Sequence, residues 1–385
     1  MLIINAEIHT LDKNDRIIEN GFLEIENDKI VSVKNMSEFD KNIDNAIDVK
    51  GKSIYPGFID AHTHIGVFED SISFEGSDGN EDTDPVTPNL RVVDGINSFD
   101  GYFNDAVMAG VTTVIVSPGS TNVIGGNITA LKTVGKQIDK MILKDPVAIK
   151  FALGENPKST YNDREQTPVT RMAIAALIRE NLNRARRYLE NKENEENYSE
   201  YDPKCEALIP LLEKKIPAHF HVHRADDIFT AIRICKEFDL DYVLVHATDA
   251  HLITDELKEE NAAVLSGPFL TDRSKPELKN LSPSAPGILS SGGIKTAIIT
   301  DHPEIPISFL NVCAAIAVRE GMAHSDAIKA LTINAAEICG ISHRVGSLEE
   351  GKDADLFVID GDPINIMNKP DMVIVNGKIA FNAHK

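Results

Sequence analysis

The feature that most constrains the fold of this chain is a regular alternation of short apolar segments with longer stretches of helical pattern. Strands that alternate with helices are typical of a parallel sheet, because a parallel connection has to cross back over the sheet. We identify eight such strands, at residues 58–63, 112–117, 128–133, 147–153, 218–223, 242–245, 262–266 and 295–300. Eight units predict an α/β fold built on a (β/α)8 TIM barrel.

Both ends of the chain have a different pattern, in which short strands are separated by turns and no helical stretch intervenes. This pattern covers residues 2–8, 22–25 and 29–33 near the amino terminus, and residues 355–359 and 372–379 near the carboxyl terminus. Neither segment is large enough to bury a core alone. We therefore predict a small composite β-sandwich domain formed by residues 1–54 and 346–385, beside a barrel domain of residues 55–345.

The composition excludes several classes of partner. The chain of 385 residues has a formal net charge of −21, which repels nucleic acid and anionic membranes. It has no apolar run long enough to span a bilayer, and its amino terminus reaches acidic residues too early for a secretory signal. Its four cysteines are scattered, as in a reducing compartment. We predict a cytoplasmic protein that acts on a small molecule, and we leave open whether it forms a homo-oligomer.

Histidines and one aspartate gather where four of the predicted strands end. His62 and His64 end the first strand, three histidines of one parity end the fifth, His246 ends the sixth, and Asp301 follows the eighth. Side chains two residues apart on a strand point to the same side, and the active sites of such barrels lie at the carboxyl ends of the strands. Histidine and aspartate are common ligands of divalent metals. The pattern therefore predicts a metal site.

Three motifs carry a resemblance to a known family. They are the run Pro56-Gly57-Phe58-Ile59-Asp60-Ala61-His62-Thr63-His64, the run Gly351-Lys352-Asp353-Ala354-Asp355-Leu356, and the terminal Asn376-Gly377-Lys378. With these motifs the chain resembles the amidohydrolase superfamily, in the group of metal-dependent hydrolases related to imidazolonepropionase. The resemblance implies a divalent metal cofactor of one or two ions, with zinc favoured and manganese or iron as alternatives. The ligands that it implies are His62, His64, His221, His246 and Asp301.

The resemblance also implies a bridging ligand near the end of the fourth strand, and two residues compete for that role. Lys150 would have to be carboxylated on its amine, and burial favours the neutral amine that this needs. Glu155 needs no modification and lies nearer the strand end, and strand parity does not decide between the two. On the fifth strand we favour His221 as the ligand. We expect a buried structural role for His219 and a position at the rim for His223.

The chemistry that the resemblance implies is attack by a metal-bound hydroxide on a carbonyl, with Asp301 as general base and then as general acid. The expected enzyme is an amidohydrolase that cleaves a C–N bond of an amide or cyclic amide in a small molecule. A deaminase of the same superfamily is the alternative. Such relatives usually carry a glutamate two or three residues past the fifth-strand histidine, whereas no carboxylate follows His221 until Asp226. A non-catalytic barrel homologue is a second alternative, which the filled strand ends disfavour.

Substrate contacts are expected from the loops that follow the strands. We single out Asn122, Asn156, Arg171 and His223, and for Arg171 a salt bridge at a helix start is an equal alternative to a substrate carboxylate. A long insertion, residues 68–103, follows the first strand directly. A surface excursion and a lid or subunit contact both fit its acidic, glycine-containing composition.

Overall fold

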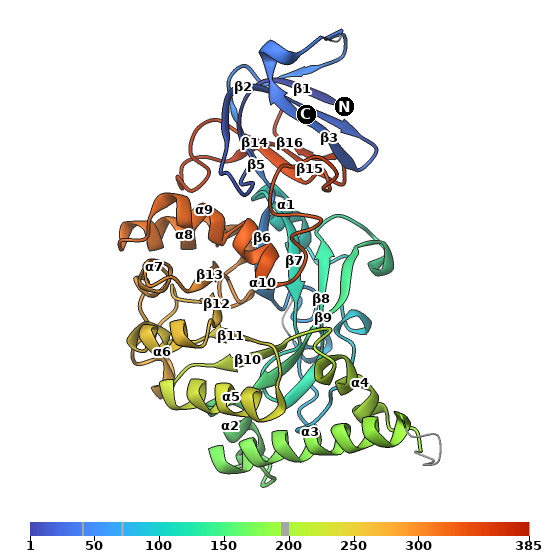
Figure 1. Cartoon of the computed structure of the whole chain (residues 1–385), viewed down its shortest axis with the longest axis vertical. Helices are drawn as coiled ribbons and strands as arrows, with labels where there is room; N and C mark the ends of the chain where they lie inside the picture. The colour runs from blue at the N-terminus through green and yellow to red at the C-terminus, as the bar shows by residue number, and fades with distance from the viewer. Residues whose placement is uncertain (41, 71–72, 194–199, 385) are drawn as a thin grey trace.

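Two eight-stranded sheets organise the structure, a computed structural model that describes residues 1–40, 42–70, 73–193 and 200–384 (Figure 1). The predicted barrel, with a smaller β unit made from both chain ends, is confirmed. The barrel sheet follows chain order and consists of β6 (Phe58–Thr63), β7 (Val111–Val116), β8 (Ile124–Lys132), β9 (Ile142–Ala152), β10 (Ala218–Val222), β11 (Tyr242–His246), β12 (Ala263–Ser266) and β13 (Lys295–Ile298).

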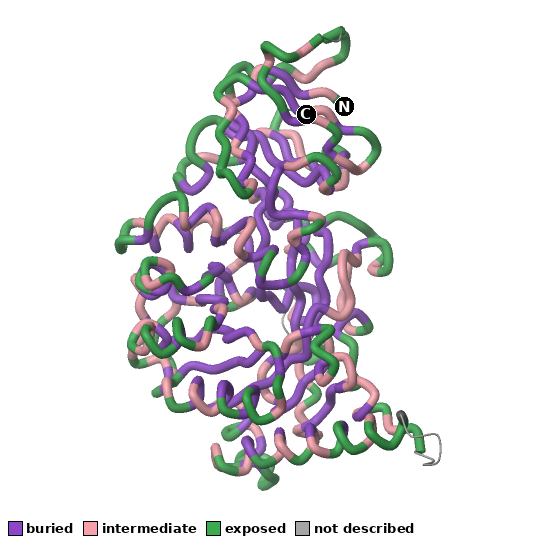
Figure 2. Tube along the Cα trace, viewed as in Figure 1, coloured by how far each residue is buried: buried purple, intermediate pink, exposed green. Residues whose placement is uncertain are grey.

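Helices follow most of these strands and lie on the outside of the barrel. Buried and exposed residues alternate along each of the outer helices (Figure 2). In the longest, the side chains of Ile174, Ile178 and Leu182 are fully buried at a spacing of four residues, so one face packs on the barrel. None of the helices in the described residues is both long and apolar enough to cross a bilayer. The helices are α1 (Tyr102–Met108), α2 (Glu155–Asp163), α3 (Arg171–Glu193), α4 (Pro203–Leu212), α5 (Ala225–Phe238), α6 (Thr254–Glu259), α7 (Ala285–Ser291), α8 (Leu310–Arg319), α9 (His324–Ala330) and α10 (Ile333–Ile338).

The third strand departs from the expected parallel pattern. β8 runs antiparallel to both β7 and β9, so that the three form two successive hairpins. The reason is the length of the connection at residues 117–123, because a parallel crossover needs about a dozen residues or more. The expectation that every barrel strand is parallel is therefore wrong at this position. The amino-terminal end of β8 lies at the rim where the other strands end.

The seam between the first and last barrel strands is held largely by a side chain. Within the described residues, no strand ladder joins β6 to β13. Instead, the buried carboxylate of Asp60 accepts a hydrogen bond from the backbone N–H of Thr300 at 3.3 Å and another from its hydroxyl. Further along both segments, the N–H of His64 donates to the carbonyl oxygen of His302 at 2.8 Å. The seam thus ties the ends of β6 and β13 together beside Asp301.

The insertion at residues 68–103 lies against β8. β7 pairs only with the second half of β8, at Thr129 to Lys132. On the first half, Val86 and Arg91 of the insertion form bridges to Ile124 and Asn127. The insertion therefore covers an edge of β8 that β7 leaves unpaired.

The second sheet brings the two chain ends together. Its hydrogen-bonded path is β16-β15-β14-β5-β1-β2-β3, with β4 beside β1. Ile30 and Ile374, from strands near opposite ends of this path, belong to one buried cluster, so the sheet encloses its own core. The domain limits 1–54 and 346–385 stay a prediction. The strands are β1 (Leu2–His9), β2 (Ile17–Glu26), β3 (Lys29–Asn35), β4 (Ile47–Asp48), β5 (Ser53–Pro56), β14 (Leu356–Ile359), β15 (Pro370–Val375) and β16 (Lys378–Asn382).

Candidate metal centre

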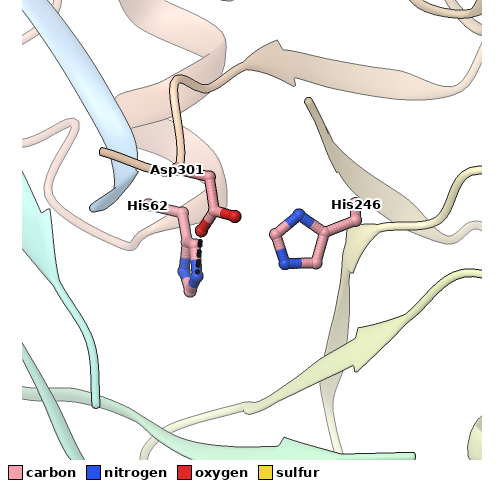
Figure 3. Close-up of side chains that lie close together, drawn as sticks. All are labelled: His62, His246 and Asp301. Carbon is pink, nitrogen blue, oxygen red and sulfur yellow. Dashed lines mark ion pairs between the residues drawn. The ribbon is translucent and has the colours of Figure 1, made fainter. Parts of the chain in front are cut away.

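His62, His64 and Asp301 converge at the end of the barrel where most of its strands have their carboxyl ends. His62 belongs to β6, His64 follows its last residue, and Asp301 follows β13 across the seam. Oδ1 of Asp301 lies 3.5 Å from Nε2 of His62 and 3.3 Å from Nε2 of His64. Figure 3 shows that the ring of His246 faces the same point from the opposite wall. One ligand atom from each of His62, His246 and Asp301 lies within 4.8 Å of the others, so this trio could hold a metal ion.

Lys150 lies at the base of the same cluster. It is fully buried on β9, and its Nζ is 3.3 Å from Nε2 of His62. Burial lowers the pKa of Lys150 to about 8, although the negative charge of Asp301 by itself would raise this pKa. The amine therefore loses its proton more easily than an exposed lysine. Glu155, the competing candidate, begins α2 and lines the cavity above the cluster.

The end of β10 supplies two more imidazoles, which pack against that of His246 at the end of β11. The rings of His221 and His246 are 4.6 Å apart, and that of His223 stacks on His246 at 5.0 Å. Burial, followed by neighbouring positive charge, lowers the pKa of His221 and His223 well below the ordinary value, so both are neutral. Neutral imidazole is the form that binds metal.

Two residues of the cluster have backbone conformations that L side chains rarely adopt. The φ angle is 66° at His246 and 54° at Asp301, both in the left-handed region. Such positions cost roughly 1–3 kcal/mol and persist where the surroundings hold them in place. They turn both side chains into the mouth of the barrel.

Several buried polar atoms of the cluster lack a hydrogen-bond partner among the described residues. They are Nδ1 of His62, Nδ1 of His221 and Oδ1 of Asp301. Polar atoms that stay unpaired in a protein interior are costly unless a ligand or metal satisfies them. The donor set of imidazole nitrogens and carboxylate oxygen therefore fits a divalent cation.

His64 and His246 show the complementary pattern. Nδ1 of His64 donates to the carbonyl oxygen of Ser117 at 2.8 Å, and Nδ1 of His246 donates to that of Gly267 at 2.7 Å. A backbone acceptor on one ring nitrogen fixes the tautomer and leaves the lone pair of the other free for a metal. These contacts point Nε2 of both residues toward the cluster.

A cavity of about 670 Å³ opens above the cluster. His64, His221, His223 and Asp301 form its floor, and residues of the 68–103 insertion, among them Phe68, form part of its wall. A larger hollow of about 800 Å³ lies against β2 and β3 and contains none of these side chains. The cavity above the histidines is therefore the one that matters for chemistry.

The predicted substrate-contact residues divide into two groups. His223 and Asn156 line the cavity. Arg171 does not, because its Nε donates to the buried carboxylate of Asp227 at 3.0 Å. Asn122 is also outside the lining, with its amide nitrogen donating to the hydroxyl of Thr87 at 2.7 Å.

His219, for which a structural role was expected, is fully buried inside the barrel, and both its ring nitrogens lack partners among the described residues. Burial, followed by the charges of Lys150 and Lys144, lowers the pKa of His219 to about 3, so the ring is neutral.

Sequence reasoning missed two residues of the loop after β12. Glu277 belongs to a short 3-10 helix, Pro276–Leu278, and is 1% exposed. Its Oε1 lies 3.7 Å from Nε2 of His223, and a ligand atom of Glu277 groups with His221 and His223 within 4.8 Å. Lys275 lines the cavity directly. Neither residue has a strand position or a motif that marks it, so only the fold reveals them.

Comparison with known proteins agrees with this architecture. The amidohydrolase family profile matches residues 53–380. The crystal structure of an amidohydrolase from Thermotoga maritima MSB8 superposes with a TM-score of 0.94 at 41% identity, covering 99% of both chains. The amidohydrolase tasK of Hapsidospora irregularis is 27% identical over 94% of this chain, which spans 40% of the length of that relative. A 5-methylthioadenosine/S-adenosylhomocysteine deaminase of Bacillus thuringiensis is 45% identical over 64 residues, which are 16% of this chain and 14% of the relative. By its fold and by the family profile that it matches, this chain belongs to the amidohydrolase family.

Proposed function

We propose that this protein is a metal-dependent hydrolase that cleaves a C–N bond of an amide or cyclic amide in a small molecule. The observation that carries the proposal is the convergence of imidazoles and one carboxylate, several with unpartnered atoms, on one point beneath a cavity. The chain carries this cluster where barrel enzymes of many kinds have their active sites. The proposed ligands are His62, His64, His221, His246 and Asp301, and the proposed ion is zinc.

We further propose Lys150, rather than Glu155, as the residue that bridges two ions. Nζ of Lys150 lies within the cluster, 3.3 Å from His62, whereas Glu155 begins a helix at the cavity wall. A neutral amine reacts with CO2 to give a carbamate and releases one proton, and the carbamate would offer two oxygens to the ions in place of one nitrogen. The environment of Lys150 supports that reaction, because burial disfavours the charged amine.

A divalent ion, when bound, lowers the pKa of water and polarises a carbonyl. The residues of this chain do the rest. Asp301 accepts the proton of the attacking water and returns it to the departing nitrogen, so that the C–N bond breaks instead of the new C–O bond. His64 and His246 are held by backbone carbonyls and do not need to rotate during the reaction.

Deamination is the second candidate, and the similarity to the Bacillus deaminase over 64 residues favours it. The sequence after His221 argues against it, because Val222, His223, Arg224 and Ala225 contain no carboxylate that would donate a proton to a ring nitrogen. Deamination would replace amide hydrolysis as the proposed function if the protein released ammonia from aminopurines or aminopyrimidines and released no amino acid or amine from amides.

The decisive measurement combines metal analysis with a substrate screen. We expect at least one divalent ion per chain after reconstitution with zinc, and hydrolysis of some member of a set of N-acyl amino acids, dipeptides and cyclic ureides. Asp301→Asn should lower turnover about 10²- to 10⁴-fold. Asp255→Asn, which removes an exposed carboxylate on α6, is the matched control. Metal content near zero after reconstitution would contradict the proposal.

A further inference from the structure

Lys275 is an isolated cation in an acidic cavity. Among the described residues that line the cavity, it is the one lysine or arginine. Four carboxylates line the same cavity, those of Glu155, Asp272, Asp301 and Glu304. Despite them, Lys275 forms no ion pair within 4.0 Å in the described part of the chain, whereas many of the other lysines and arginines do. Its charge is therefore left for a ligand.

One neutral contact occupies part of the ammonium group. Nζ of Lys275 donates to Oδ1 of Asn156 at 2.6 Å. An ammonium has three donors, so two remain for a bound molecule. The amide nitrogen of Asn156 donates to the hydroxyl of Ser120 at 2.7 Å, which fixes the orientation of the amide and presents its oxygen to Lys275.

The loop that carries Lys275 is fastened to the same helix at a second point. Oε2 of Glu277 accepts a hydrogen bond from the backbone N–H of Glu155 at 2.9 Å. Two residues of the loop thus hold two successive residues at the start of α2, with Pro276 between them restricting the backbone. A cation held this way loses little freedom when it binds a ligand.

The position of Lys275 places it beside the metal centre. The amide nitrogen of Asn156, its partner, lies 3.4 Å from Nε2 of His221. Lys275 lines the same cavity as His221 and His223. A group bound by Lys275 would therefore lie close to the bond that is cleaved.

We propose that Lys275, held by Asn156 and Glu277, binds a carboxylate of the substrate next to the scissile C–N bond. This inference rests on the proposed hydrolase function and narrows its substrates to small acids such as N-acyl amino acids. A phosphate is a poorer fit, because one lysine faces four carboxylates that repel a dianion. Lysine also acts as a point charge that a single carboxylate satisfies.

The test uses matched pairs of N-acetyl amino acids and their carboxamides with the zinc-loaded enzyme. Both turnover and binding are measured, the latter by saturation-transfer NMR so that it does not depend on catalysis. Wild type should prefer acids, and Lys275→Gln should lower kcat/KM and affinity for acids about ten- to a hundredfold, the range for one charge-assisted hydrogen bond. It should change the values for carboxamides less than about twofold. Lys275→Arg should keep part of the preference.

Lys279→Gln is the control, since Lys279 lies exposed on the same loop, is absent from the cavity lining, and gives the same change in net charge. Equal use of acids and carboxamides by wild type, or equal losses on both in Lys275→Gln, would overturn the carboxylate site. The site would also be overturned if none of the tested acids bound to wild type more tightly than to Lys275→Gln. Acid-selective binding without turnover would instead refute the hydrolase function and leave the site standing.

Discussion

Replacing Lys132 with methionine should destabilise the contact between the barrel and the second sheet. Lys132 ends β8 and is 2% exposed. Because β8 runs antiparallel, this end faces the second sheet, where Nζ lies 2.9 Å from Oδ2 of Asp353 and also contacts Asp355. Methionine fills a similar volume but leaves Asp355 without a cationic partner among the described residues and removes one of the cations that pair with Asp353.

The magnitude follows from the geometry. Two unit charges 2.9 Å apart attract with about 6 kcal/mol at an effective dielectric constant of about 20. The loss of this attraction is partly offset, because the variant no longer has to bury the ammonium group of Lys132. Asp353 keeps Arg344 at 2.7 Å and also Lys29, whereas within the described residues Asp355 keeps only the backbone N–H of Asn376 at 2.8 Å. We expect a loss of about 3 to 5 kcal/mol, as for other buried pairs that lose one partner.

Urea unfolding of Lys132→Met, followed by far-UV circular dichroism, measures this loss. The double variant Lys132→Met/Asp355→Asn should recover much of it, because it also removes the uncompensated charge. A loss below about 1 kcal/mol in the single variant, or a double variant no more stable than the single one, would refute the reasoning that an unpaired buried carboxylate causes the effect.

Two further predictions concern stability. Burial alone would raise the pKa of Asp353, but Arg344 and the adjacent lysines outweigh burial and hold this pKa below its usual range. The ionised Asp353 therefore stabilises the fold fully at pH values above about 4, the pKa of this carboxyl group in the unfolded chain. The stabilisation is lost as the pH falls toward the lower pKa of the folded protein. Asp353→Asn should therefore be less stable at pH 7 and lose less stability on acidification, which thermal melts between pH 7 and pH 3 would show; parallel curves for both proteins would contradict the assignment. Gly126→Ala should cost about 1–3 kcal/mol, because a methyl group there would lie 2.3 Å from the carbonyl oxygen of Leu90. Gly101→Ala, whose added methyl group meets nothing within 4 Å, should change the unfolding midpoint little, and equal effects of the two substitutions would argue against the steric cause.

The barrel was predictable because its strands are short apolar runs that alternate with helical stretches, and side chains along any strand repeat with a period of two. The same period explains why His62 and His64 point to one side, and why residues as far apart in the chain as His62 and Asp301 meet at one rim. The orientation of β8 was not predictable from its own residues, since it depends on the length of the connection before it. The composition of a strand does not indicate whether it pairs parallel or antiparallel with its neighbours.

Loop contacts were predictable only in part. The place of Asn156 follows from its position after β9, and the cavity contains it. Arg171 was open between a substrate carboxylate and a salt bridge, and its guanidinium meets Asp227, which lies far along the chain. Glu277 and Lys275 owe their places to contacts with α2, across more than a hundred residues of sequence, and no local pattern encodes such a contact.

The insertion at residues 68–103 contributes both to the barrel sheet and to the cavity wall, which bears on how this protein can evolve. Val86 and Arg91 complete an edge of the barrel, while Phe68 and Asn80 of the same segment face the cavity. Substitutions or deletions here would alter substrate preference and barrel integrity together. Evolution of new specificity through this segment therefore carries a stability cost that compensating changes elsewhere must offset, whereas the loop with Lys275 can vary with less risk to the sheet.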